Sequence, residues 1–232
     1  MTETIDWRTW SEAFAFAGNS LLKPLSQTPS VGLDSAFWDA FPNFESDEVS
    51  RALSRCRDFA ALEGDRDERV ASCSIEYTRL FVGPPEPAAA PWETMYCPGG
   101  AHVGFGRPTF EMKRLLRDAG FELSGESHQY EDHLGIELLY LSARCERENG
   151  PASAGELVAY VREHPLSWID SFADAIAAAA PEGYYERIVR LSAALLRAFD
   201  CGLSSFAEAD VARTGPLRPT TGQDGAGTGE QA

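Results

Sequence analysis

The stretch QYEDHLGIELLYLS, residues 129–142, decides the fold class. Its apolar residues Leu134, Leu138 and Leu141 recur at the spacing of one helix face, so we expect a helix from residue 131 to about residue 148. The same periodicity recurs along nearly the whole chain, and no convincing alternating strand or internal repeat interrupts it. The sequence therefore predicts an all-α protein, an irregular bundle of about eight or nine helices.

The other expected helices are identified by the same apolar spacing. Ser153 to Glu156 (SAGE) has the pattern of a capping box and should open one helix, and Gly202 should end the last one. Helices are expected over about residues 7–17, 49–60, 70–80, 109–119, 157–164, 167–176 and 184–199.

One interval, GPPEPAAAPWETMYCPGGAHVGFGRP, breaks the helical pattern. Uncovered connections longer than about 12 to 15 residues are uncommon in compact domains and are often functional. We therefore expect one all-helical domain over residues 1–212, with an N-terminal lobe over about 1–83, a hinge loop over about 84–108 and a C-terminal lobe over about 109–212. A Gly/Thr/Pro-rich tail over 213–232 should be disordered.

The bulk composition excludes several classes of protein. Twenty Lys and Arg against 36 Asp and Glu give a net charge of −16, which argues against nucleic-acid binding and favours basic partners. The chain has no apolar run of the roughly 18 to 20 residues that a membrane span needs, and its first residues lack the basic and apolar segments of a signal peptide. Five cysteines spread singly do not suggest a disulfide framework. We expect a cytoplasmic protein without stable membrane association.

The acids and the histidine at the front of residues 129–142 admit several interpretations. Acids can simply complement the dipole of a helix start, and Glu137 can pair locally with His133. His133 and Glu137 would supply only two metal ligands, whereas a zinc site needs at least three ligands from the protein. We therefore expect no metal and no cofactor. The chain also lacks the nucleophile and phosphate-binding motifs of common enzymes, and we expect no catalytic residues. Two alternatives stay open: a metal-dependent hydrolase that uses His102 as well, and an acidic helical adaptor without a ligand groove.

A second constellation, EYTRLFVGPP, covers residues 76–85. Tyr77, Leu80 and Phe81 have the spacing of core residues. Neighbouring positions on a helix point about 100° apart, so one of Leu80 and Phe81 can face the core while the other faces a groove.

Together these stretches resemble a known family. EYTRLFVGPP, PWETMY (residues 91–96) and EDHLGIELLYLS (131–142), with a looser match at HPLSWIDSFADAI (164–176), are similar to the TorD/DmsD family of cytoplasmic chaperones. Those chaperones serve molybdenum-cofactor oxidoreductases that are exported by the twin-arginine route. The resemblance covers roughly residues 7–202.

The resemblance implies an all-α chaperone, not an enzyme, that binds the twin-arginine leader of a molybdopterin reductase catalytic subunit and holds the apoenzyme for cofactor insertion. The alternative within the family is a chaperone that binds another part of such a subunit, as nitrate-reductase assembly factors do. The chain departs from the family at Gln129-Tyr130, where Glu-Pro is common. The residues that the resemblance assigns to peptide binding are Tyr77, Leu80, Phe81, Trp92, Glu93, Tyr96, Asp132, His133 and Glu137.

The chemistry of such a leader fits these residues. A leader combines two arginines with an apolar stretch, and desolvated arginine is bound best by carboxylates. We therefore expect Asp132, Glu137 and Glu93 to lie together in an aromatic-lined, anionic cleft between the two lobes. The long hinge loop is compatible with a monomer or with a domain-swapped dimer.

Overall fold

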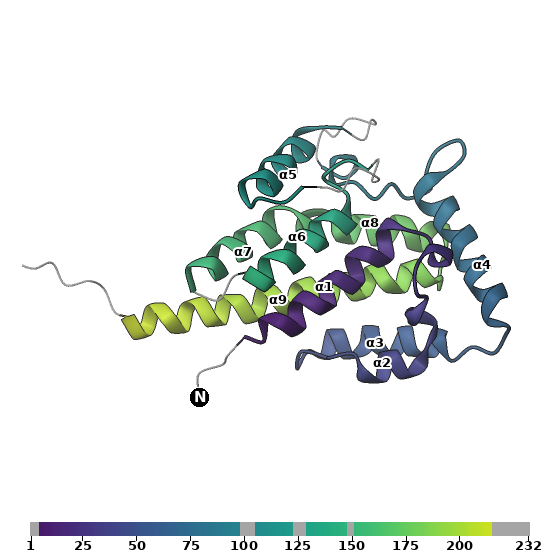
Figure 1. Ribbon diagram of the computed structural model, residues 1–232, viewed down its shortest axis with the longest axis horizontal. Coiled ribbons are helices and arrows are strands. Elements are labelled where there is room, and N and C mark those ends of the chain that lie inside the picture. The colour runs from purple at the N-terminus through teal and green to yellow at the C-terminus, as the bar shows by residue number, and fades with distance from the viewer. Residues whose placement is uncertain (1–4, 98–104, 123–128, 148–150, 215–232) are drawn as a thin grey trace, which may run out of the picture.

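The computed structural model describes residues 5–97, 105–122, 129–147 and 151–214. Within these ranges the chain is helical almost throughout, and a single isolated β-bridge takes the place of any strand (Figure 1). The prediction of an all-α fold is confirmed.

The helices are joined by connections of very different length, of which the longest lies between α4 and α5. The α-helices are α1 (Trp7–Leu22), α2 (Ser35–Ala40), α3 (Asp47–Ala60), α4 (Arg66–Tyr77), α5 (Arg107–Asp118), α6 (Leu134–Arg147), α7 (Pro151–Glu163), α8 (Pro165–Ala179) and α9 (Tyr184–Thr214). Short 3₁₀ turns lie at Leu25–Gln27, Val31–Leu33 and Glu93–Met95, and a π-helical turn at Thr78–Val82.

Helices from both sides of the predicted hinge share one hydrophobic core. The helix α1 packs along α6, and α9 contacts α1, α3, α7 and α8. In Figure 1, α5 lies on one side of this bundle and the α2–α3 pair on the other. The division into two lobes stays a prediction, but the described segments before and after the hinge are packed against each other.

The first part of the predicted hinge is held against the bundle. The amide of Ala89 donates to the carbonyl of Leu80 at 2.9 Å, and Ala89, Ala90 and Pro91 are buried. Residues 98–104 of the predicted hinge lie outside the described ranges.

The last helix does not end at Gly202, as the sequence suggested, but runs to Thr214. Glycine costs a helix only about 1 kcal/mol, which tertiary contacts can outweigh. Here Leu203 is buried in the core just beyond the glycine. The guanidinium of Arg162, on α7, donates to the carboxylate of Asp200 and to the hydroxyl of Ser204, one on each side of Gly202. Residues 213 and 214, the first two of the predicted tail, belong to α9, and residues 215–232 lie outside the described part.

Two helix starts also differ from expectation, and proline explains both. The SAGE segment at 153–156 does not open α7, which begins at Pro151. Likewise α8 begins at Pro165 rather than at Ser167. Proline is favoured at the first position of a helix because its φ is already helical and its missing amide would have no partner there.

In the described part of the chain, no helix is both long enough and apolar enough to cross a membrane.

The contact between α1 and α6 is made possible by two glycines. A Cβ on Gly135 would lie 2.8 Å from the carbonyl oxygen of Gly18, and a Cβ on Gly18 would lie 2.7 Å from the carbonyl oxygen of Gly135. Side chains at either position would therefore force backbone apart, and α6 carries the candidate site at its N-terminal end.

We predict that Gly135→Ala lowers the free energy of unfolding by about 1–3 kcal/mol, the usual cost of overpacking. Gly155→Ala is the matched control, because Gly155 lies exposed in α7 with no atom within 4 Å of the added Cβ. That change should be neutral or stabilise the protein by up to about 1 kcal/mol. Urea denaturation followed by circular dichroism measures both, and equal effects would contradict the close helix contact.

Candidate functional site

The nine residues expected to bind a peptide fall into three groups. Tyr77, Leu80 and Phe81 are buried in the core. Trp92 and Tyr96 are half-buried on the loop before α5. The charged residues and the histidine, which are Glu93, Asp132, His133 and Glu137, are all buried.

The first group is joined to the others through Phe172 of α8. The ring of Phe81 lies 5.9 Å from that of Phe172, and the ring of Tyr96 lies 5.8 Å from the same Phe172 ring. Tyr96 also stacks on Trp168 at 5.3 Å. Both Leu80 and Phe81 are buried, so the structure shows neither of them facing a groove. Tyr77, Leu80 and Phe81 therefore belong to the core, and Phe81 contacts Tyr96 only indirectly, through Phe172.

The loop before α5 is paired with the entrance to α6. The amide of Glu93 donates to the carbonyl of Asp132 at 3.0 Å, and the amide of Leu134 donates to the carbonyl of Pro91 at 2.9 Å. These bonds form an antiparallel β-bridge between Trp92 and His133. Because an extended pairing occupies residues 132 and 133, α6 begins at Leu134 and not at the expected residue 131.

Asp132 binds both neighbouring segments through its carboxylate, which is fully buried. One oxygen accepts from the amide of Thr94 at 3.0 Å and from its hydroxyl at 2.6 Å. The other accepts from the hydroxyl of Thr109, in the first turn of α5, at 3.0 Å. A buried charge is tolerated when hydrogen bonds satisfy it, and three such bonds replace its water. Asp132 therefore fixes three segments to one another.

His133 caps the helix that it precedes. Its Nδ1 accepts from the amide of Gly135 at 2.9 Å, so the ring is neutral with its proton on Nε2. The Nε2 atom is buried and has no hydrogen-bond partner. Burial lowers the pKa of His133 to about 3. An uncharged ring resolves the difficulty that a cationic histidine would be unfavourable at a helix N-terminus.

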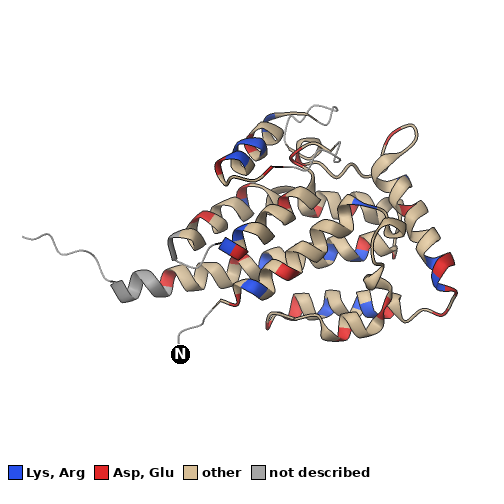
Figure 2. Cartoon of the chain, in the orientation of Figure 1, with Lys and Arg blue, Asp and Glu red and all other residues tan. Residues whose placement is uncertain are grey.

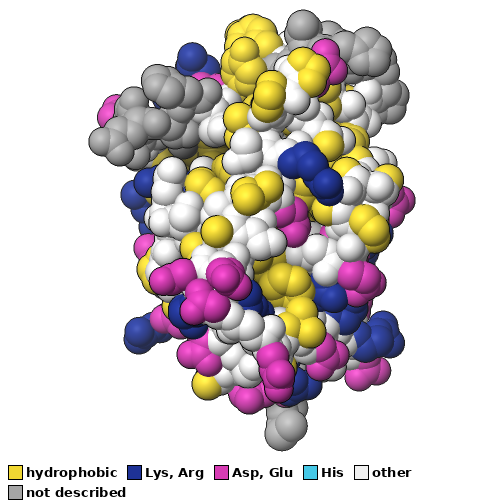
Figure 3. Space-filling model, turned by 90° about the vertical axis from the view of Figure 1, so that its right-hand side faces the viewer, with side chains coloured by type: hydrophobic (Ala, Val, Ile, Leu, Met, Phe, Trp, Pro, Cys, Tyr) yellow, Lys and Arg dark blue, Asp and Glu magenta, His cyan; other side chains and the backbone are white. Residues whose placement is uncertain are grey.

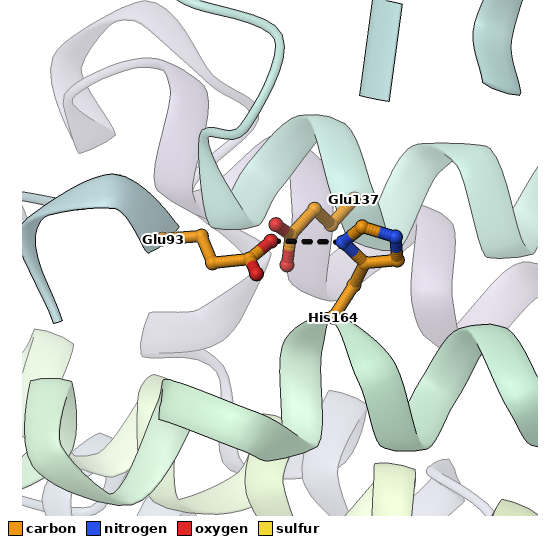
Figure 4. Close-up of side chains that lie close together, drawn as sticks. All are labelled: Glu93, Glu137 and His164. Atoms are coloured by element: carbon orange, nitrogen blue, oxygen red, sulfur yellow. Dashed lines mark hydrogen bonds and ion pairs between the residues drawn. The ribbon is translucent and has the colours of Figure 1, made fainter. Parts of the chain in front are cut away.

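Three side chains form a cluster beside this loop (Figure 4). They are Glu93 from the 3₁₀ turn, Glu137 from α6 and His164 from the junction of α7 and α8. The Nδ1 atom of His164 lies 2.9 Å from a carboxylate oxygen of Glu93. The indole of Trp168 donates to Oε2 of Glu137 at 3.2 Å. Burial and then the neighbouring Glu93 carboxylate raise the pKa of Glu137 well above its ordinary value. His133 does not join this group, so the pair of ligands considered from the sequence does not form.

A groove of about 1080 Å³ opens onto this cluster between α5, α6 and α7. Four glutamates and three arginines line it, and α5 carries acids and bases close together (Figure 2). Two of the arginines are paired within it, Arg107 with Glu111 at 2.8 Å and Arg144 with Glu156 at 3.1 Å. Its lining residues are Glu93, Thr94, Cys97, Gly106, Arg107, Pro108, Glu111, Arg114, Leu115, Tyr140, Arg144, Glu156, Ala159, Tyr160, Glu163, His164 and Ser167.

An aromatic surface, defined here as Trp92, Phe105, Phe110 and Tyr130, lies beside the groove. Phe105 contacts both Phe110 and Tyr130, with ring centroids 4.9 and 5.6 Å apart, and Tyr130 contacts Trp92 at 6.1 Å. Phe105, Phe110 and Tyr130 are 49%, 60% and 41% exposed, which is unusual for large apolar rings in contact with one another. Tyr130 is one of the two residues by which the sequence departs from the family pattern.

A second hollow, of about 500 Å³, lies on another face between α4 and the loop after the π-helical turn. That face carries exposed hydrophobic side chains among charged ones (Figure 3). Ile75 and Val82, near this hollow, are 70% and 59% exposed. Arg79 lies in its wall together with Glu86, so it offers one acid and one base.

Four residues of the site have no role that the sequence predicts: His164, Trp168, Thr94 and Thr109. His164 and Trp168 lie in the loosely matching segment 164–176, and that match was the available signal. Thr94 lies inside the PWETMY motif. Thr109 was recognised only as the start of a helix, and nothing in its local sequence indicates that its hydroxyl reaches residue 132. His102 and His128 fall outside the described residues.

The depressed pKa of His133 gives a pH dependence of stability. The folded state keeps the ring neutral down to about pH 3, whereas the unfolded chain takes up the proton near the ordinary value of 6.5. Stability is therefore lost as the pH falls from 6.5 toward 3, by at most about 1.4 kcal/mol per pH unit.

We predict that His133→Asn removes this component, because asparagine can still accept from the amide of Gly135 and does not titrate. Chemical denaturation of both proteins over that pH range gives the difference between their free energies of unfolding. This difference isolates His133, since the two proteins share all their other titratable groups. Parallel stability curves would contradict a neutral, buried His133.

The chain is similar to proteins of a known family. A model of the family described as nitrate reductase delta subunit matches residues 45–174. The chaperone protein TorD of Vibrio cholerae is 22% identical over 196 residues, which cover 81% of this chain and 88% of that protein. The probable Tat proofreading chaperone DmsD of Haemophilus influenzae is 26% identical over a stretch that covers 55% of this chain and 60% of that protein. The Tat proofreading chaperone DmsD of Salmonella typhimurium is 26% identical over a stretch that covers 50% of this chain and 54% of that protein.

The matched relatives are named as chaperones and not as enzymes. The matched segment runs from α3 to α8 and so contains the loop, the cluster and the entrance to α6. The chain belongs to the TorD/DmsD family of redox-enzyme maturation chaperones.

Proposed function

We propose that this chaperone binds the twin-arginine leader of a molybdopterin oxidoreductase subunit in the cytoplasm and holds the apoenzyme until its cofactor is inserted. The observation that carries the proposal is a groove with four glutamates and three arginines in its lining, bordered by an exposed aromatic surface at the N-terminal end of α5. Gly106 and Arg107 line the groove, and the neighbouring Phe105 belongs to the aromatic surface.

The groove fits the cationic part of a leader. Glu163 is exposed at its rim and Glu93 lies deeper in its wall. Arginine forms its strongest pairs with carboxylates in partly desolvated sites, where charge-assisted hydrogen bonds are worth more than in water. The net charge of −16 speeds the encounter with such a peptide.

The aromatic surface fits the apolar part. Flat rings offer a large contact area at a small entropic cost, and exposed aromatic residues are common anchors of peptide binding. Trp92 is shared between the predicted peptide-binding set and this surface, and it is paired through the backbone with His133. Of the described residues that line the second hollow only Glu86 is acidic, whereas four glutamates line the groove, so the hollow is the poorer site for a twin-arginine motif.

The nine residues taken from the family resemblance enter the proposal with different roles. Trp92, Tyr96 and Glu93 contact the leader. Asp132 and His133 hold the loop that presents them, and Glu137 lies behind Glu93 in the cluster. Tyr77, Leu80 and Phe81 are buried in the core, and Phe81 packs on Phe172, on which Tyr96 also packs.

A second candidate function is assembly of a nitrate-reductase-type subunit through a part other than its leader. The description of the matching family, nitrate reductase delta subunit, favours it. The same groove would then receive a different basic and apolar segment of the client.

The proposal predicts that a synthetic leader peptide with a Ser-Arg-Arg-x-Phe motif binds with a Kd in the micromolar range or tighter at low salt. Replacing both arginines with alanine should weaken binding at least tenfold, or about 1.4 kcal/mol. Isothermal titration calorimetry measures both. Undetectable binding at low salt, or equal binding of the two peptides, would contradict it.

Two matched pairs of variants locate the peptide. Phe110→Ala should weaken leader binding about tenfold, whereas Leu62→Ala should not, since Phe110 and Leu62 are similarly exposed at 60% and 56% but only Phe110 belongs to the aromatic surface. Glu163→Gln should weaken it by a few fold, and Glu63→Gln, in the exposed turn between α3 and α4, should leave it unchanged. Full binding of a client subunit without its leader would instead support the second candidate.

A further inference from the structure

The cluster of Glu93, Glu137 and His164 has a feature that leader binding does not explain. One ligand atom from each residue lies within 4.8 Å of those of the other two, and the three side chains are 4%, 0% and 7% exposed. They come from three elements that are far apart in sequence, and all three point toward one centre (Figure 4). The packing of α6, α7 and the 3₁₀ turn therefore brings together two carboxylates and an imidazole, all three of them buried.

One oxygen of this cluster has no partner. Oε2 of Glu137 accepts from Trp168, but Oε1 is buried and no hydrogen-bond donor of the described residues reaches it. Its close neighbour is the carboxylate of Glu93, which also accepts and does not donate when ionised. Two carboxylates that meet in an apolar interior need either a proton between them, which the raised pKa of Glu137 allows, or a cation.

A further donor and an access path are present at the same place. The thiol of Cys97, one turn after Glu93, lies 3.8 Å from Oε1 of Glu93 and is half-buried. Glu93, Cys97 and His164 all line the groove, so an ion can enter from it without unfolding the protein. The resulting donor set contains nitrogen, oxygen and sulfur.

We propose that Glu93, Glu137 and His164 form a binding site for a divalent transition-metal ion of the zinc type, with a fourth position that faces Cys97 and the groove. Three protein ligands and one open position are the usual arrangement of a non-structural zinc site. The two carboxylates balance the charge of the ion. Magnesium and calcium are disfavoured because they require six or more oxygen ligands and bind imidazole and thiol poorly.

This site does not depend on leader binding. The ion would lie in the wall of the same groove, so it would also fix Glu93 and the 3₁₀ turn on which the groove is built.

The test uses the full chain after treatment with a chelator and desalting. We expect one equivalent of Zn²⁺ to bind in a calorimetric titration, and Co²⁺ to give the visible absorption of a four-coordinate site. Glu137→Gln should lower the Zn²⁺ affinity at least 100-fold, since even the loss of an outer hydrogen bond to a ligand costs about 10–100-fold. Glutamine can still accept from Trp168, so the fold should survive.

Glu68→Gln is the control for binding of cations to the acidic surface, because Glu68 is exposed in the first turn of α4 and away from the groove. It should bind Zn²⁺ like the natural chain. His164→Gln is the second ligand variant, and circular dichroism confirms folding of all proteins. The proposal is overturned if the natural chain binds less than one equivalent of Zn²⁺, or if Glu137→Gln and His164→Gln bind Zn²⁺ as tightly as the natural chain does. It is also overturned if Glu68→Gln lowers the Zn²⁺ affinity as much as the two ligand variants do. Leader binding by the chelator-treated protein is measured separately, so that the metal site and the leader-binding function can each be contradicted without the other.

Discussion

The buried carboxylate of Asp132 is the interaction on which the candidate site depends. It accepts hydrogen bonds from the amide and the hydroxyl of Thr94 and from the hydroxyl of Thr109, and it is closed off from water. These bonds tie the loop before α5, the first turn of α5 and the entrance to α6 into one unit. Glu93 can reach the cluster beside α6, and the aromatic surface can form beside the groove, because these three segments are fixed in this way.

Most of the fold could be predicted from the sequence because the apolar faces of the helices recur at a regular spacing. The end of α9 could not, since it depends on tertiary contacts, whereas the starts of α7 and α8 follow a local signal, proline at the first helical position, that the apolar spacing does not contain. Arg162 and Leu203 carry α9 past Gly202, and a local pattern does not reveal a partner 38 residues away. Likewise, the β-bridge of Trp92 with His133 removes residues 131–133 from the helix that the local sequence favours.

The site was predicted only in part, for a similar reason. The motifs identified Glu93, Asp132 and Glu137, but an acidic residue in a sequence is expected to be solvated, and here all three are buried. Their burial depends on partners from distant segments. His164 is 71 positions from Glu93, and Thr109 is 23 from Asp132. The sequence therefore indicates the residues of the candidate site, whereas the structure shows that Asp132 and His133 hold the loop and the entrance to α6 through buried hydrogen bonds.

The most direct test of this account is hydrogen–deuterium exchange of Asp132→Ala compared with the natural chain. The variant leaves the buried groups of Thr94 and Thr109 without their acceptor, at a cost of about 1–3 kcal/mol for each unsatisfied group. The account predicts faster exchange of the amides of residues 92–97 and of the first turn of α5, with unchanged protection in α1 and α9. Unchanged exchange in the loop before α5 would contradict the role assigned to Asp132.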